Sequence, residues 1–348
     1  MKLKKNFSLS LDQFINHSLY DKKSGYYMKK NPFGKMGDFI TAPNISRLFS
    51  EMISIWTIAF WQSLGSPKKF NLIELGAGNG EMMKDIIETL QNFPFIFNSC
   101  NFIIHEKSPL LIKIQKKKLK KNKITWINQI KKVENFPSLF LANEFFDAIA
   151  IKQFSKKRNL WFEKFVKFEN NKKAFFYEKK TNIKNLEKKI NLKISKNQNF
   201  IEYSELGFNY LKEISKIIKK SSGGLLVIDY GNNNKKMKNT LKGVSNHKFA
   251  NILKNVGNTD ITHNINFNLF KKFIEQMGNL DSNLTSQKKF LLKLGIRERA
   301  EIISKNLNFS EKANIYYRLK RLIDDKQMGG LFKVMLIKNK KNRFNLGF

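Results

Sequence analysis

Residues 74–80 of this chain read Glu-Leu-Gly-Ala-Gly-Asn-Gly, and this stretch decides the predicted fold. It follows an apolar run at residues 70–75 and precedes a segment with helical periodicity at residues 81–90. A strand, a glycine turn and a helix in this order predict a βα unit of a parallel sheet. Glycine lets the backbone approach a ligand closely, and the N-terminus of the next helix presents free N–H groups. The turn is therefore a candidate cofactor site.

The glycine spacing separates two kinds of nucleotide cofactor. A dinucleotide-binding turn requires a third glycine at the sixth position of the motif, which is Glu81 here. Three alternate glycines preceded by an acid are instead the pattern of S-adenosylmethionine (SAM) methyltransferases, and Glu74 would suit the cationic end of SAM. The alternative is a bare βα turn whose glycines serve only packing.

Strands and helices alternate along most of the chain, which predicts a parallel sheet covered on both faces. We expect a seven-stranded, Rossmann-like α/β fold in one domain over residues 1–348. Strands are predicted at residues 70–75, 102–105, 124–127, 138–144, 225–229 and 331–337, and helices at 45–61, 81–90, 109–119 and 270–277. Asn44 is expected to cap the first of these helices.

Two stretches depart from the alternation. Residues of about 152–220 are rich in Lys and Asn, and we interpret them as an inserted subdomain with a hairpin formed by residues 161–168 and 174–177. Residues 232–264 are too long for an ordinary loop, so we expect a functional segment or a lid there.

Polar residues follow the second and third predicted strands. Glu106 stands where doubly wound folds place an acid that accepts hydrogen bonds from ribose hydroxyls. Ser108 could cap the next helix or contact the ligand, and Asn128 could contact the adenine. The alternative for Glu106 is a solvated carboxylate at the end of a strand.

A second polar group follows the fourth predicted strand. Asn143, Glu144 and Asp147 stand at its carboxyl end, where open α/β sheets bind ligands. Their oxygens could bind a guanidinium or orient an amine that accepts a methyl group. The alternative is a helix N-cap cluster, which for Asp147 has about equal weight.

Composition limits the other classes of function. The net charge is +37, but 58 of the 65 basic residues are Lys, and the chain is also rich in Asn, Ile and Phe, which share A/T-rich codons. We attribute the charge to genome composition and expect no specific nucleic-acid partner, because Arg forks are scarce. One cysteine and four scattered histidines give no metal-ligand spacing, so no metal is expected.

No apolar run approaches the roughly 20 residues that a membrane helix needs. The basic residues 1–7 are followed at once by patterned sequence, without an apolar region or a cleavage site. We therefore expect no signal or transit peptide, and a soluble cytoplasmic protein.

Several motifs in order make the chain similar to the MidA family of SAM-dependent methyltransferases, and the resemblance covers nearly the whole chain. They are Leu19-Tyr20-Asp21, Gly25-Tyr26-Tyr27, residues 37–43 (Gly-Asp-Phe-Ile-Thr-Ala-Pro), residues 74–80, Asn143-Glu144-Phe145-Phe146-Asp147-Ala148, Ile228-Asp229-Tyr230-Gly231, Asp260-Ile261-Thr262 and Met328-Gly329. The chain departs from the family pattern at Asn44 and Asn128, where the family has acids, and at Val256, where it has proline.

The resemblance implies a fold, a cofactor and a reaction. The cofactor would be S-adenosyl-L-methionine, which the resemblance and the patterns above place at Gly37, Asp38, Glu74, Gly76, Gly78, Gly80, Glu106, Ser108 and Asn128. The reaction implied is methyl transfer to an arginine nitrogen of a protein, with the 49 kDa-type subunit of respiratory complex I as the first candidate. Glu144 would bind the guanidinium, and Asn143 and Asp147 would help. Two alternatives stay open: a non-catalytic assembly chaperone that binds SAM, and a methyltransferase that acts on nucleic acid.

Overall fold

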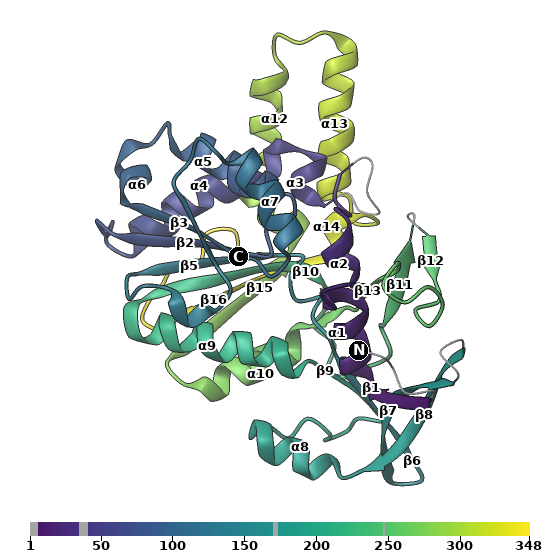
Figure 1. Ribbon diagram of the computed structural model, residues 1–348. Helices are drawn as coiled ribbons and strands as arrows, with labels where there is room; N and C mark the ends of the chain where they lie inside the picture. Colours follow the sequence, from purple (N-terminus) through teal and green to yellow (C-terminus); the bar gives the residue numbers. More distant parts are fainter. Residues whose placement is uncertain (1–5, 35–40, 170–172, 246–247) are drawn as a thin grey trace. The chain divides into compact units, whose positions relative to one another are not determined.

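A computed structural model describes residues 6–34, 41–169, 173–245 and 248–348 (Figure 1). Gly37 and Asp38 lie outside the described residues. The chain forms two compact units, which are described separately below. Unit 1 comprises residues 1–30, 146–211 and 232–273, and unit 2 comprises residues 31–145, 212–231 and 274–348.

Unit 2 contains a sheet in which seven strands pair in the order β15-β16-β10-β5-β2-β3-β4 (Figure 1). The strands are β2 (Phe70–Leu75), β3 (Cys100–His105), β4 (Ile124–Ile127), β5 (Ser138–Asn143), β10 (Gly223–Asn232), β15 (Leu280–Ser286) and β16 (Phe332–Asn339). Neighbours from β10 to β4 are parallel, and β16 is antiparallel to both β10 and β15. The predicted seven-stranded α/β fold is therefore confirmed.

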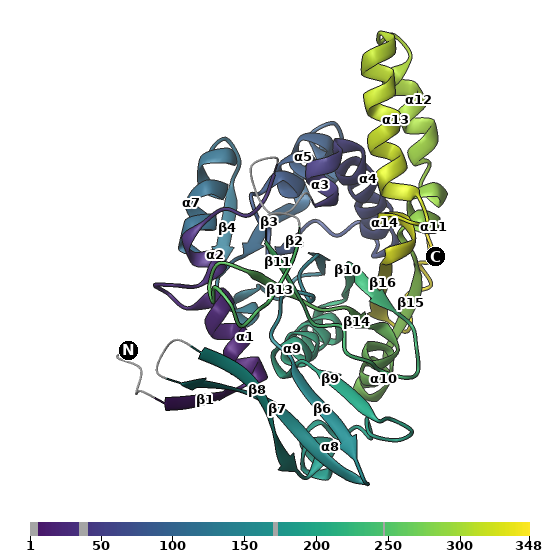
Figure 2. The ribbon, with the colours of Figure 1, turned by 90° about the vertical axis from the view of Figure 1, so that its right-hand side faces the viewer.

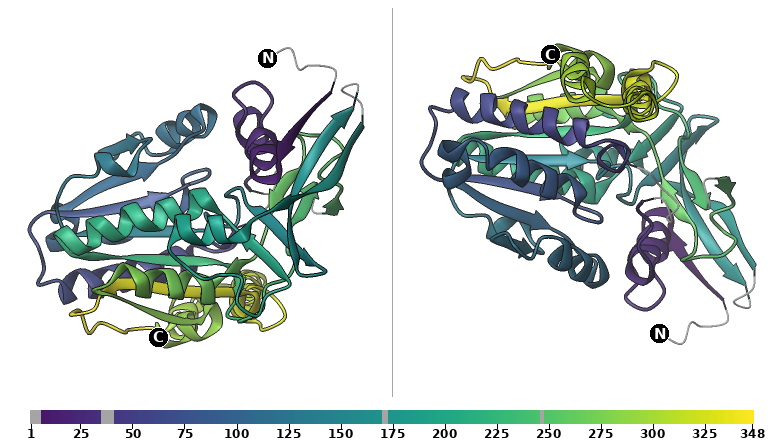
Figure 3. Two further views of the ribbon diagram at one scale, coloured as in Figure 1. Left: turned by 90° about the horizontal axis from the view of Figure 1, so that it is seen from below. Right: turned by 90° about the horizontal axis from the view of Figure 1, so that it is seen from above.

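Helices cover both faces of this sheet. Figure 3 shows α4 and α5 in front of the strands in one view, and α9 and α10 in front in the opposite view. The helices are α3 (Ala42–Ile45), α4 (Arg47–Ser63), α5 (Glu81–Leu90), α6 (Pro94–Ser99), α7 (Pro109–Lys118), α9 (Glu205–Ser221), α10 (Phe267–Met277), α11 (Gln287–Lys293), α12 (Ile296–Ser304), α13 (Phe309–Ile323) and α14 (Met328–Leu331), with a 3-10 turn at Ile130–Lys132. The division between the units falls within α9 and α10. Helices α12 and α13 lie side by side as a hairpin (Figure 2).

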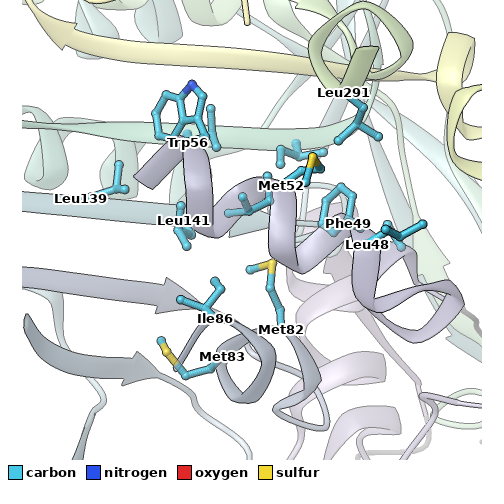
Figure 4. Packing of buried hydrophobic residues seen from close by; sticks show 14 of the residues in the cluster. Leu48, Phe49, Met52, Trp56, Met82, Met83, Ile86, Leu139, Leu141 and Leu291 are labelled. Atoms are coloured by element: carbon cyan, nitrogen blue, oxygen red, sulfur yellow. The ribbon is translucent and has the colours of Figure 1, made fainter. Parts of the chain in front are cut away.

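The core of unit 2 lies between α4, α5 and one face of the sheet (Figure 4). Buried side chains recur along both helices at a spacing of three or four residues, as an amphipathic helix on a sheet requires. Those labelled in Figure 4 include Leu48, Phe49, Met52 and Trp56 of α4, Met82, Met83 and Ile86 of α5, and Leu139 and Leu141 of β5. The Nε1 atom of Trp56 donates to the carbonyl of Leu346 at 2.9 Å, which ties the C-terminal segment to this core.

Most predicted elements of unit 2 are confirmed, but two details differ. Helix α4 begins after Ser46, whose side chain accepts from the N–H of Leu48, so the predicted cap at Asn44 is wrong. Asn44 lies in the short helix α3, and its side chain donates to the Thr41 hydroxyl. Strand β15 was not predicted: it lies at the sheet edge, and Leu280 is its only buried residue.

Unit 1 contains a five-stranded antiparallel sheet in the order β1-β7-β6-β9, with β8 also paired to β7. Its elements are β1 (Asn6–Ser10), α1 (Leu11–Tyr20), α2 (Tyr26–Lys29), β6 (Lys152–Lys157), β7 (Leu160–Glu169), β8 (Lys173–Thr181), α8 (Ile183–Ile190) and β9 (Phe200–Tyr203). The hairpin predicted at residues 161–168 and 174–177 is formed by β7 and β8. The inserted subdomain of about 152–220 stays a prediction.

The segment 232–264, for which the sequence predicted a functional segment or a lid, contains short strands. It contributes β11 (Lys242–Ser245), β12 (Lys248–Ala250) and β13 (Asp260–Thr262) to a three-stranded antiparallel sheet, and the short β14 (Ile265–Asn266) follows. The three strands have three or four residues each, too few to show the alternation that predicts a strand. Within the described ranges, no helix combines the length and apolar character needed to cross a membrane.

Candidate active site

The three glycines after β2 all adopt left-handed backbone angles. The φ angle is +66° at Gly76, +52° at Gly78 and +77° at Gly80. A Cβ atom at Gly76 would lie 2.9 Å from the ring of Phe145, and one at Gly78 would lie 3.2 Å from the ring of Phe33. Side chains are disfavoured here both by φ and by the close approach of the rings. The turn thus depends on glycine, and it leads directly into α5.

Glu74, at the end of β2, has a carboxyl group that is buried in the protein. It is only 4% exposed, and burial together with the nearby charge of Glu106 raises its pKa to about 8. The backbone of Met83 in α5 hydrogen-bonds to the carboxyl group. Among the described residues, no group donates to its Oε2 atom. A buried carboxyl oxygen without a donor in the protein can accept a hydrogen bond from a cationic ligand.

Glu106 follows β3 and is held by the chain that comes after it. Its Oε1 atom accepts from the backbone N–H of Lys107 at 2.8 Å and of Ser108 at 2.9 Å. Burial raises the pKa of the Glu106 carboxyl, and these hydrogen bonds oppose that shift. Ser108 is buried and caps α7, because its hydroxyl accepts from the N–H of Leu111 at 3.2 Å. Ser108 therefore caps the helix, which is one of the two roles that the sequence analysis gave it.

Gln115 is a residue of this site that the sequence analysis missed. It is fully buried on α7, and its Nε2 atom donates to the carbonyl of Gly78 at 2.8 Å and to Oε2 of Glu106 at 3.3 Å. It therefore connects two of the segments predicted to bind the cofactor. The sequence feature that could have indicated Gln115 is its place on the apolar face of the predicted helix, four positions after Leu111.

Asn128 directly follows β4 and is exposed. Backbone pairing places the start of this segment beside the end of β3, because the N–H of Glu106 donates to the carbonyl of Ile127 at 3.2 Å. The structure thus brings Asn128 to the same edge of the sheet as Glu106. Gly37 and Asp38 are not placed, because they lie outside the described residues.

Asn143 and Glu144 stand together at the end of β5. Glu144 has a left-handed φ of +49°, which is strained for a residue with a side chain. Its N–H donates to the carbonyl of Ile228 at 2.9 Å, and its Oε1 accepts from the N–H of Ala42 at 3.4 Å. The Nδ2 atom of Asn143 donates to the same Oε1 at 3.3 Å. The Oδ1 atom of Asn143 is buried and has no hydrogen-bond partner among the described residues.

One pocket brings the glycine turn and the end of β5 together. It is open to solvent, and both groups of residues line it. Glu74, Gly76 and Gly78 contribute from the side of β2, and Asn143 and Glu144 contribute from the side of β5. Phe33, Thr41, Pro43, Asn44, Ala77, Asn79, Glu81 and Met82 complete its lining. The parallel pairing of β2 with β5 explains this arrangement, because parallel strands end at the same edge of a sheet.

Asp147 belongs to unit 1, whereas Asn143 and Glu144 belong to unit 2. Its Oδ2 atom accepts from the Thr262 hydroxyl at 2.9 Å, and its carbonyl accepts from the N–H of His263 at 3.2 Å. Burial raises the pKa of the Asp147 carboxyl. The structure therefore ties Asp147 to the end of β13.

A model of a family of S-adenosyl-L-methionine-dependent methyltransferases matches residues 52–285, which is more than half of the chain. The chain belongs to this methyltransferase family. The assignment confirms the activity and the cofactor expected from the glycine turn, and it makes the chain an enzyme.

Relatives and solved structures agree with the assignment. The chain is 27% identical to the mitochondrial protein arginine methyltransferase NDUFAF7 of Xenopus laevis, over 95% of this chain and 81% of the relative. It is 26% identical to the human protein of the same name, over 95% and 80%. A protein from Burkholderia thailandensis, solved bound to S-adenosyl-homocysteine, has the same fold, with a TM-score of 0.81, 20% identity and coverage of 98% and 90%.

The cytoplasmic location expected from the sequence is contradicted by these relatives, which are named as mitochondrial proteins. The expectation rested on a basic N-terminal segment without an apolar region. That observation bears on a secretory signal, whereas mitochondrial targeting segments are basic and amphipathic rather than apolar.

The residues of the methyltransferase pocket suit SAM. SAM carries a cationic sulfonium, and the pocket supplies the buried Oε2 of Glu74. The backbone of the glycine turn lines the pocket at Gly76 and Gly78, with the Phe33 ring close to Gly78. Among the described residues, no group of three His, Cys, Asp or Glu side chains is arranged to hold a metal ion.

Proposed function

We propose that this methyltransferase transfers the methyl group of SAM to an arginine nitrogen of a protein. The observation that carries the proposal is the shared pocket, which is lined both by the glycine turn and Glu74 and by Asn143 and Glu144. The relatives named protein arginine methyltransferase support the choice of acceptor. The 49 kDa-type subunit of respiratory complex I is the first candidate substrate, by the family resemblance.

The proposed cofactor site lies along the carboxyl ends of β2, β3 and β4. Gly76, Gly78 and Gly80 would allow the backbone to approach SAM, and the charge of an ionised Glu74 would attract its cationic part. Glu106 would accept from the ribose hydroxyls, with Ser108 holding the start of α7 in place. Asn128 would contact the adenine. Gly37 and Asp38, which lie outside the described residues, stay predictions from the sequence.

The proposed acceptor site consists of oxygen acceptors that suit a guanidinium. The Glu144 carboxylate provides negative charge, and the buried Oδ1 of Asn143 provides a second acceptor. A guanidinium has five N–H donors in a planar fork, so it can engage both groups at once. The strained backbone of Glu144 holds its carboxylate at the pocket, and such strain is common at functional sites. Asp147 belongs to unit 1, and its contribution stays a prediction from the sequence.

Methyl transfer requires few covalent steps from the protein. When bound, SAM would supply the methyl group of its sulfonium, and the sulfur would keep the electron pair of the bond that is broken. The arginine nitrogen forms the new bond to carbon and loses one proton, which Glu144 can accept or pass to water. Most of the rate should come from alignment of the nitrogen and exclusion of water.

Transfer of labelled methyl from SAM to the purified 49 kDa-type subunit of the same cell tests this proposal. Mass spectrometry should locate the label on an arginine. In Glu144→Gln we expect near-normal SAM affinity and a transfer rate at least about tenfold lower, because the charge on the acceptor site is lost. Glu301→Gln, on the exposed face of α12, is the matched control and should retain full activity.

Two results would count against the proposal. Label on a nucleic acid, or on a protein residue other than arginine, would show that the acceptor is wrongly assigned. A Glu144→Gln variant with an unchanged melting temperature and full activity would show that the acceptor site lies elsewhere.

A further inference from the structure

Gln115 has no part in the chemistry above, yet its side chain contacts three separate segments around the proposed cofactor site. Its Nε2 atom donates to the carbonyl of Gly78 in the glycine turn and to Oε2 of Glu106 after β3, at 2.8 and 3.3 Å. Its Oε1 atom accepts from Nε1 of Trp126 in β4 at 2.9 Å. The side chain also packs on Gly80, where an added Cβ would lie 3.4 Å from Cγ of Gln115.

These contacts require an amide of this length. Gln115 is fully buried, so each polar atom of its side chain needs a partner within the protein. A carbonyl and a carboxylate both need a donor, whereas the Trp126 indole needs an acceptor. A carboxylate at this position could not donate to Gly78 or Glu106, and an apolar side chain would leave all three groups unsatisfied.

The contact with Glu106 fixes the second oxygen of an already constrained carboxylate. The backbone N–H groups of Lys107 and Ser108 hold Oε1, and Gln115 holds Oε2. The other charges that act on this carboxylate are those of Lys107, beside it, and Glu74, from β2. Donation from Gln115 favours the ionised form of Glu106, which is the form that accepts hydrogen bonds at both oxygens.

We propose that Gln115 is a positioning residue for SAM, which holds the Gly78 carbonyl and the Glu106 carboxylate in one fixed arrangement. The glycine turn and the acid then bind the cofactor as a unit rather than as two independent contacts. The inference rests on the proposed placement of SAM at these two segments.

SAM affinity of the full-length variants Gln115→Met and Gln115→Glu, measured by calorimetry, tests the inference. Gln153→Met is the matched control, because Gln153 is equally buried and also makes three side-chain hydrogen bonds, in this case to Glu202, Asn239 and Lys164 of unit 1. We expect the dissociation constant of SAM to rise about tenfold or more in Gln115→Met, and further in Gln115→Glu, which adds a like charge beside Glu106. In Gln153→Met it should stay within about twofold of the wild type. The melting temperature should fall in both Met variants.

A double-mutant cycle separates positioning from general destabilisation. If Gln115 acts through Glu106, adding Gln115→Met to Glu106→Gln should weaken SAM binding much less than it does in the wild type. Equal effects in both backgrounds, or a Gln115→Met affinity like that of Gln153→Met, would overturn the inference. If Glu106→Gln and Gly78→Val both bound SAM normally, the placement of SAM itself would be wrong. Normal binding by Gln115→Met alone would refute only the role of Gln115.

Discussion

Replacement of Glu74 by Gln should make the protein more stable at alkaline pH. Burial, and secondly the charge of Glu106, raises the pKa of Glu74 to about 8 in the folded protein, against 4.5 for an ordinary Glu. Between these two values the unfolded chain has lost the proton and the folded chain keeps it. Folding stability therefore falls as pH rises through this window, and the loss is complete above about pH 8.

The size of the effect follows from the shift. Each pKa unit corresponds to about 1.36 kcal/mol, so the change from 4.5 to about 8 corresponds to about 5 kcal/mol. Because Gln cannot ionise, the folding stability of Glu74→Gln should not fall with rising pH in this way. Relative to the wild type, the variant should gain about 4 kcal/mol of unfolding free energy between pH 5 and pH 9, since part of the loss has already occurred at pH 5.

Urea denaturation of both proteins without SAM, at pH 5, 7 and 9, measures this difference. Glu301→Gln, at an exposed position of α12, controls for the loss of one carboxyl group. Parallel stability curves for Glu74→Gln and the wild type would refute the reasoning, because they would show that Glu74 is ionised at neutral pH as easily in the folded protein as in the unfolded chain.

The same carboxyl should couple SAM binding to pH. A cationic ligand beside Glu74 favours its ionised form, so binding below pH 8 should release a proton. Calorimetry of the wild type in buffers of different ionisation enthalpy should detect this release, and it should be absent in Glu74→Gln. Binding without proton exchange in both proteins would place the cationic part of SAM away from Glu74.

Three further predictions follow from the glycines and from the net charge. Gly78→Val should abolish SAM binding measured by calorimetry, because a side chain there meets the Phe33 ring and disfavours the left-handed backbone; wild-type affinity in a folded variant would contradict this. Gly223→Ala should lower the unfolding free energy by more than about 3 kcal/mol, because its Cβ would lie 1.9 Å from the carbonyl oxygen of Ser138. The control is Gly65→Ala, which also has a positive φ but no atom within 4 Å of the added Cβ, and it should lower the unfolding free energy by only about 1 kcal/mol. Duplex DNA should bind, if at all, without sequence preference and with an affinity that falls steeply with salt; a sequence-specific complex at physiological salt would contradict the compositional explanation of the +37 charge.

The sequence alone determined the elements whose signals are local. Strand β2 and helix α5 have the bounds that were predicted, because an apolar run, three glycines and an amphipathic segment follow one another without interruption. The sequence also indicated Glu74 and Glu106 correctly as residues at strand ends, since the topology of a parallel sheet brings such ends to one edge. Strand β15 was missed because an edge strand has little apolar surface to bury and thus no alternating pattern.

The tertiary structure decided which polar groups share a site. Gln115 makes side-chain hydrogen bonds to three partners that are 9, 11 and 37 positions away along the chain. Glu144 and Asp147 are close in the sequence, yet the fold assigns them to different units and ties Asp147 to Thr262. Hydrogen bonds between distant segments have no periodicity that a sequence can display, so only the folded chain could determine them.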